Sequence, residues 1–152
     1  MITLRDVIRI NASPEDIFEW LENLDKNYRE WHQDHVKWEF LNGFREGCRC
    51  YCEETLHGRL HRMKGRITNL RKNRLVEFKF SFPTSLVCSG GSFIIEPEGI
   101  GSTFIATLSF RFAVLLSRFA KKRMNSVKDH MKEEGQNLKK ILEGSYPSVT
   151  TH

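Results

Sequence analysis

Apolar residues near the N-terminus follow first a strand pattern and then a helix pattern. Residues 7–10 are typical of a short first strand. Ser13 can then cap a helix, because its hydroxyl accepts a hydrogen bond from a free backbone N–H, and Pro14 suits the first helical position. The apolar side of this helix consists of Ile17, Phe18, Trp20, Leu21 and Leu24. A second short helix is expected over residues 25–33.

The apolar period then changes to two, which predicts antiparallel strands with one apolar and one wet face. Val36, Trp38 and Phe40 are expected to share the apolar face of the first of these strands. Further strands are expected from about Cys48 to a bend near Gly58, and over residues 58–69, 74–82, 90–98 and 103–112.

A long amphipathic helix is predicted from Leu116 to Glu143, with Gly144 as its C-cap residue. Its apolar stripe consists of Leu116, Ala120, Met124, Val127, Met131, Leu138, Ile141 and Leu142. Glu134 lies near the middle of this stripe, and His130 lies on its flank one turn earlier. A buried carboxylate is costly to ionise unless it is paired, so Glu134 is the most unusual polar residue of the pattern.

The order of one strand, two short helices, about six strands and a long helix indicates an α+β fold. A curved antiparallel sheet of about seven strands has an apolar concave face, and the C-terminal helix is the element that can cover it. We expect a single domain over residues 1–144 and a loose tail over residues 145–152.

Composition and charge narrow the functional classes. The chain is 39% hydrophobic and 28% charged, which is typical of an ordinary folded domain. The longest apolar runs are too short for a transmembrane helix, and the N-terminus lacks a signal-peptide pattern, so a cytoplasmic protein with reduced cysteines is expected. No nucleic-acid motif accompanies the net charge of +5, so no nucleic-acid partner is expected, whereas weak association with an anionic surface stays open.

The three cysteines of residues 48–52 share one strand face. Their parallel side chains are poorly placed for a disulfide or for tetrahedral metal coordination, so we expect small apolar residues that line the interior. This register places Glu54 inside and Glu53 outside, unless a bulge exchanges the faces.

These motifs resemble the START-like, or SRPBCC, superfamily with its helix-grip fold, which includes the birch-pollen-allergen and polyketide-cyclase families. The resemblance is carried by residues 10–21, 65–80, 93–110 and 130–143, and it looks closest to an uncharacterised prokaryotic branch. It implies a cavity between the sheet and the long helix that binds a hydrophobic molecule. In some members it implies cyclisation, dehydration or hydrolysis.

The strand faces and this resemblance together predict an apolar cavity lining. Its expected members are Trp38, Phe40, Cys50, Cys52, Met63, Phe78, Phe80, Phe104, Leu108, Phe110, Val127 and Met131. Each of these residues could equally serve core packing alone.

Four polar residues could converge on the same cavity: Glu54, His61, His130 and Glu134. Glu134 could pair structurally with His61 or Arg123, or the group could orient the polar head of a ligand. In a third interpretation, His61, His130 and Glu134, joined by His32 or His35, hold a divalent metal such as Zn²⁺. No established metal signature matches the spacings, so no cofactor is expected.

His32 and His35 have two open interpretations of their own. They could make local packing contacts and backbone hydrogen bonds, or they could chelate as an i,i+3 pair with Asp34 fixing a tautomer.

We therefore expect a domain that binds a small hydrophobic or lipid-like molecule, as a monomer or homodimer. The alternative is an enzyme of cyclase, dehydrase or hydrolase type in which Glu134, Glu54 or His130 transfers protons, with or without a metal. A module that binds a partner through the basic face of the long helix is a third option.

Overall fold

The computed structural model describes residues 1–112, 116 and 118–144. Its elements, in chain order, are β1 (Ile2–Ile10), α1 (Pro14–Glu22), α2 (Leu24–Trp31), β2 (His35–Phe40), β3 (Arg49–Leu56), β4 (Arg59–Arg71), β5 (Leu75–Phe80), the 3₁₀ turn η1 (Thr84–Leu86), β6 (Cys88–Glu98), β7 (Gly101–Phe110) and α3 (Ala120–Gly144).

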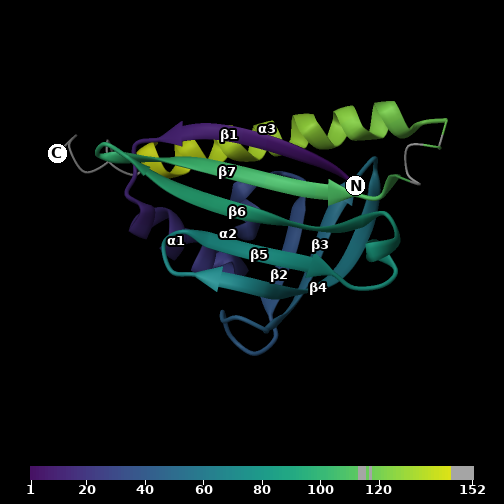
Figure 1. Ribbon diagram of the computed structural model, residues 1–152, viewed down its shortest axis with the longest axis horizontal. Coiled ribbons are helices and arrows are strands. Elements are labelled where there is room, and N and C mark those ends of the chain that lie inside the picture. The colour runs from purple at the N-terminus through teal and green to yellow at the C-terminus, as the bar shows by residue number, and fades with distance from the viewer. Residues whose placement is uncertain (113–115, 117, 145–152) are drawn as a thin grey trace.

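The described strands form one antiparallel sheet in the order β1-β7-β6-β5-β4-β3-β2. Successive strands are neighbours except for β1, which returns to pair with β7 at the opposite edge from β2. Helix α3 runs along β1, and α1 and α2 lie below it on the same side of the sheet (Figure 1). The α+β helix-grip architecture predicted from the sequence is therefore confirmed.

The first helix begins where its sequence predicts. The Ser13 hydroxyl accepts a hydrogen bond from the Asp16 backbone N–H at 3.1 Å, and Pro14 occupies the first turn. The apolar side of α1 is buried against the sheet through Ile17, Phe18 and Leu21. Local sequence and tertiary packing agree here, which is why this helix boundary could be predicted.

Several boundaries differ from the expectation, with β1 for example extending back to Ile2, and two of the differences have a clear physical reason. Helix α3 begins at Ala120 rather than at Leu116, which is 89% exposed and therefore gains little from packing on the sheet. Strand β2 begins at His35, and a register shift between His35 and Lys37 turns His35 inward and leaves Val36 exposed. A bulge of this kind exchanges the two faces of a strand.

Close packing fixes α3 against β1 and shapes β6. A Cβ atom on Gly135 would lie 2.8 Å from Asp6 Oδ2, so this helix position lies directly on β1. In β6, a Cβ atom on Gly91 would lie 2.2 Å from the Thr107 carbonyl oxygen of β7. The SGGS run, which carried no phosphate-loop context in the sequence, is thus a tightly packed segment of the sheet.

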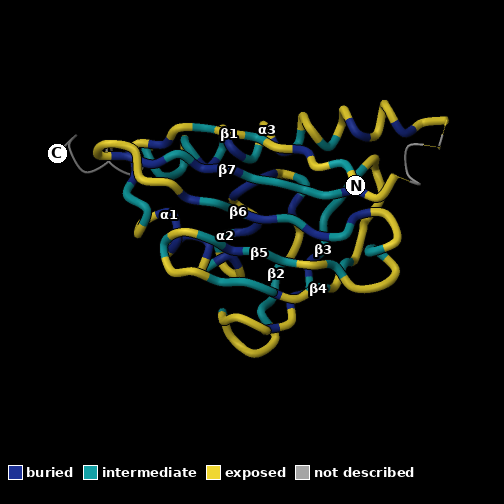
Figure 2. The backbone as a smooth tube through the Cα atoms, viewed as in Figure 1, coloured by how far each residue is buried: buried dark blue, intermediate teal, exposed yellow. Residues whose placement is uncertain are grey.

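Buried residues lie along the strands and the inner sides of the helices, while the turns and the outer side of α3 are exposed (Figure 2). The core comprises a larger group beneath α1 and α2 and a smaller one beneath the first half of α3. None of the described helices is both long enough and apolar enough to cross a membrane. The predicted tail of residues 145–152 lies outside the described residues.

Candidate metal centre

The candidate site lies where α2, β2, β3 and α3 meet. Trp31, the last residue of α2, is fully buried, and its indole N–H donates to the Glu134 carbonyl oxygen at 2.8 Å. The side-chain amide of Asn137 donates to the Trp31 carbonyl oxygen at 2.9 Å. These two hydrogen bonds hold the end of α2 against the middle of α3 and so position the residues on both sides.

His35 presents an unprotonated nitrogen to two carboxylates. Its Nδ1 lies 2.9 Å from the Tyr28 carbonyl oxygen, which can only accept, so Nδ1 carries the proton of the neutral ring. Burial lowers the pKa of His35 to about 4, which keeps the ring neutral. Its Nε2 is buried without a hydrogen-bond partner, 3.0 Å from Glu134 Oε2 and 3.7 Å from Glu54 Oε2.

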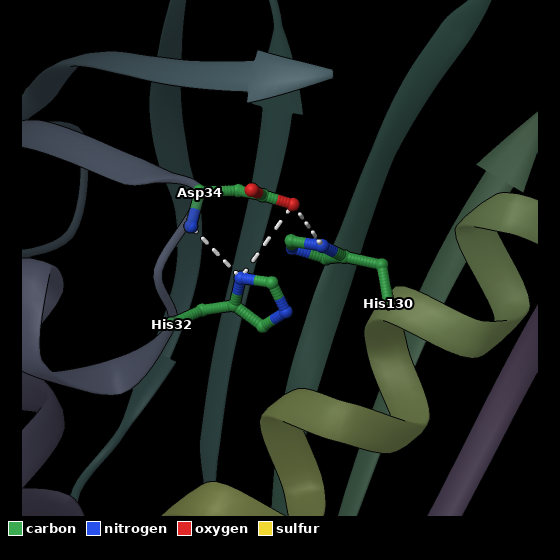
Figure 3. Close-up of side chains that lie close together, drawn as sticks. All are labelled: His32, Asp34 and His130. Carbon is green, nitrogen blue, oxygen red and sulfur yellow. Dashed lines mark hydrogen bonds and ion pairs between the residues drawn. The ribbon is translucent and has the colours of Figure 1, made fainter. Parts of the chain in front are cut away.

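His130, on α3, also faces a carboxylate on each side of its ring, at longer distances. Its Nδ1 lies 3.7 Å from Asp34 Oδ2, and Figure 3 shows the same carboxylate oxygen joined to a ring nitrogen of His130 and to one of His32. Its Nε2 is buried without a hydrogen-bond partner, 3.6 Å from Glu134 Oε1. Burial also lowers the pKa of His130, and the negative Asp34 favours a proton on Nδ1, which leaves the lone pair on Nε2.

Two carboxylates complete the group. Burial raises the pKa of Glu134 to about 7, and burial together with the nearby charge of Glu134 raises the pKa of Glu54. The Tyr28 hydroxyl donates to Glu54 Oε2 at 2.9 Å. When both carboxylates are ionised, they face each other and the lone pairs of two imidazoles, an arrangement that a cation would stabilise.

His32 belongs to the group but differs in role. Its Nδ1 accepts from the Asp34 backbone N–H at 3.0 Å, and its Nε2 lies 2.7 Å from Glu133 Oε2. In the described structure both ring nitrogens of His32 thus have polar partners. Its Nδ1 also lies close enough to Asp34 and His130 for the three residues to share a metal ion. The ring packs against His130 with 4.1 Å between centroids, so His32 supports the orientation of His130.

The structure brings together Glu54, His130 and Glu134 of the four polar residues selected from the sequence. His61 lies directly opposite Glu54 in the β3–β4 register but is exposed, and no hydrogen bond or ion pair of the described residues joins it to the group. The expected pairing of Glu134 with His61 or Arg123 is therefore wrong, because its partners are His35 and His130. His35 was undervalued because the bulge that turns it inward is not visible in the period-two pattern.

The three cysteines are buried and free, as expected of small lining residues, and Cys50 and Cys52 point inward with Glu54. Burial raises the pKa of both thiols, so neither is poised to act as a thiolate ligand.

Some residues of the predicted apolar lining are buried, and others are partly exposed. Cys50, Cys52, Phe104, Phe110 and Met131 are buried, while Trp38, Phe40, Met63, Phe78, Phe80, Leu108 and Val127 are partly exposed. An enclosed space beside Trp38, Phe40 and Phe78 has a volume of about 10 Å³, room for about one water molecule. The large interior cavity expected from the resemblance is not confirmed.

Known proteins with the same fold resemble the chain at low sequence identity. A protein of Thermus thermophilus, TTHA0849, is 15% identical with a TM-score of 0.75, the match covering 95% of this chain and 99% of that one. The di-domain ARO/CYC protein StfQ from the steffimycin biosynthetic pathway is 13% identical with a TM-score of 0.74, over 95% of this chain and 51% of that one. The Aha1 dimer from Colwellia psychrerythraea is 21% identical with a TM-score of 0.69, over 94% of this chain and 97% of that one.

No curated protein matches the sequence. A family model described as polyketide cyclase / dehydrase and lipid transport matches residues 1–143 of the 152-residue chain. With the helix-grip architecture described above, this match shows that the chain belongs to the polyketide cyclase/dehydrase and lipid-transport family of the START-like superfamily.

Proposed function

We propose that the chain is a metal-dependent enzyme in which His35, His130 and Glu134 hold one divalent cation, with Zn²⁺ the best match to this donor set. The observation that carries the proposal is the pair of buried Nε2 atoms, both without hydrogen-bond partners and both facing Glu134. Buried polar atoms in folded proteins nearly always have a partner, and a cation would satisfy both lone pairs at once.

The distances fit this assignment. One nitrogen or oxygen atom from each of the three residues lies within 4.8 Å of the other two. Ligand atoms of a tetrahedral zinc site lie about 3.3 Å apart. Glu134 Oε2 lies 3.0 Å from His35 Nε2, and Glu134 Oε1 lies 3.6 Å from His130 Nε2, so each carboxylate oxygen faces one histidine at a comparable distance. The second nitrogen of His35 donates to the Tyr28 carbonyl oxygen, as in known histidine–metal sites, and the second nitrogen of His130 lies 3.7 Å from Asp34 Oδ2.

Three protein ligands leave one coordination position open, which is typical of catalytic rather than structural zinc sites. There the cation would supply Lewis-acid polarisation of a substrate carbonyl and of water. Glu54 Oε2 lies 3.7 Å from His35 Nε2 and accepts a hydrogen bond from the Tyr28 hydroxyl, so Glu54 would act as the general base. Its raised pKa suits a carboxylate that takes a proton from attacking water and returns it to the leaving group.

We expect the substrate to be a small hydrophobic carbonyl compound. The hydrophobic molecule predicted from the sequence would then be this substrate. Partly exposed apolar side chains continue from the site along the inner face. Met63 pairs with Cys52 next to Glu54 on that face, and Val127 lies one turn before His130. Because these side chains are partly exposed, the substrate would bind over this face.

Metal titration and hydrolysis assays test the two parts of the proposal. Protein stripped with a chelator should bind one Zn²⁺ in calorimetry, and His130→Ala should abolish binding, whereas His61→Ala, a change at an exposed histidine on the same face, should not. Glu54→Gln should keep zinc but lose turnover of small hydrophobic esters. Equal zinc binding by His130→Ala would overturn the metal centre, and full turnover by Glu54→Gln would overturn the assigned base.

A further inference from the structure

Exposed apolar side chains gather at one end of the sheet, where β7 ends and α3 begins. This end, which we call the basic apolar end, includes Leu86 and Val87 after β5, and Phe112 and Leu116 after β7; all four are exposed. The Arg111 backbone N–H donates to the Val87 carbonyl oxygen at 3.0 Å, which brings the two segments side by side. The N-terminus of the chain and the start of α3 also lie at this end of the sheet (Figure 1).

The two chain segments that form this end carry positively charged side chains and no negatively charged ones. Residues 78–95 and 99–128 contain no aspartate or glutamate. The second segment contains six exposed cations: Arg111, Arg118, Lys121, Lys122, Arg123 and Lys128. Basic and acidic residues are mixed in residues 129–143 of the same helix, whereas residues 55–76 form another segment without aspartate or glutamate, with seven cations on β4 and the turns beside it. The cations of residues 99–128 are distinguished by their place, because they lie beside the exposed Phe112 and Leu116.

A groove between β1 and the first turns of α3 also combines apolar and basic side chains. Its volume is about 340 Å³, its apolar side consists of Ile2, Leu4, Ala120 and Met124, and its polar side consists of Arg118, Lys121, Asn125 and Lys128. Such a groove suits an amphiphile with an apolar chain and an anionic head.

We propose that the basic apolar end docks the protein on an anionic lipid bilayer. Large aliphatic and aromatic side chains amid lysines and arginines are typical of surfaces that sit at the headgroup boundary. Nucleic acid would use the cations but leave the exposed Leu86, Val87 and Leu116 without a role. The positions chosen for the charge test lie away from the candidate metal centre, because Lys121 and Lys122 precede His130 by about 12 to 14 Å along the helix axis.

Vesicle binding tests the proposal with matched controls from the other end of the sheet. The wild-type chain should cosediment with vesicles of phosphatidylcholine and phosphatidylserine but not with phosphatidylcholine alone. Lys121→Gln with Lys122→Gln should weaken binding about 25-fold, since each cation near an anionic surface contributes about fivefold. The control, Arg71→Gln with Lys72→Gln, removes the same charge from the exposed β4–β5 turn and should retain binding.

A second pair of variants tests the apolar contribution. Leu116→Ser should weaken vesicle binding about fivefold, whereas Ile100→Ser, at a residue equally exposed on the β6–β7 turn, should not. Equal losses in the two charge variants would reduce the effect to net charge and overturn the proposal. So would preferential binding to duplex DNA over anionic vesicles, or the absence of vesicle binding by the wild-type chain.

Discussion

Replacing Glu134 with glutamine separates a metal ligand from a structural ion pair. Glutamine has nearly the same shape but never ionises and is a poor ligand for Zn²⁺. In the metal-free protein, burial raises the pKa of Glu134 from 4.5 to about 7, which corresponds to about 3 kcal/mol of unfavourable free energy when the side chain is ionised. Because the folded-state pKa of Glu134 lies above its unfolded value, the wild-type protein has its full stability at low pH. It loses up to this amount of stability as the pH rises through about 7.

Glu134→Gln removes that penalty, so the metal-free variant should be more stable than wild type by up to about 3 kcal/mol at about pH 8, and about equal to it at about pH 4. Excess Zn²⁺ should reverse the order. A ligand at 100 times its Kd stabilises the wild-type protein by about 2.7 kcal/mol, whereas the variant should gain little.

The assay is urea unfolding of both proteins, each with chelator and with Zn²⁺, at the two pH values. The decisive result is a crossing: the variant is more stable without metal and less stable with it. A variant that is less stable without metal, and that responds to Zn²⁺ like wild type, would show that Glu134 is a paired structural charge and would refute the metal centre.

Three further predictions concern the same site and its scaffold. Asp34→Asn should lower zinc affinity about 10- to 100-fold in calorimetry without loss of folding, because Asp34 orients His130; unchanged affinity would contradict that role. Zinc affinity should rise up to about tenfold per pH unit below pH 7 and level off above it. The reason is that zinc binding displaces one proton from Glu134, while His35 is already neutral. A flat calorimetric profile over that pH range would count against Glu134 as a ligand. Ser13→Ala should lower the free energy of unfolding by about 1 kcal/mol through loss of the α1 cap and leave zinc affinity unchanged, as denaturation and titration would show.

Local sequence rules accounted for the elements whose packing agrees with their own preferences. Ser13 and Pro14 placed the start of α1, and the alternation of residues 48–54 fixed the inward face of β3, which carries Glu54 into the site. The apolar stripe of α3 similarly identified Glu134 as a carboxylate in a buried position, because the helical period alone places it among apolar residues.

The sequence by itself thus determined the order of elements, the helix-grip fold and two of the carboxylates of the site. Only the tertiary structure decided their partners. A bulge turns His35 inward, and the register of β3 with β4 leaves His61 opposite Glu54 but exposed. Side-chain periodicity is a property of one element, whereas the meeting of His35 from β2 with His130 from α3 depends on how distant elements pack, and no local pattern records that.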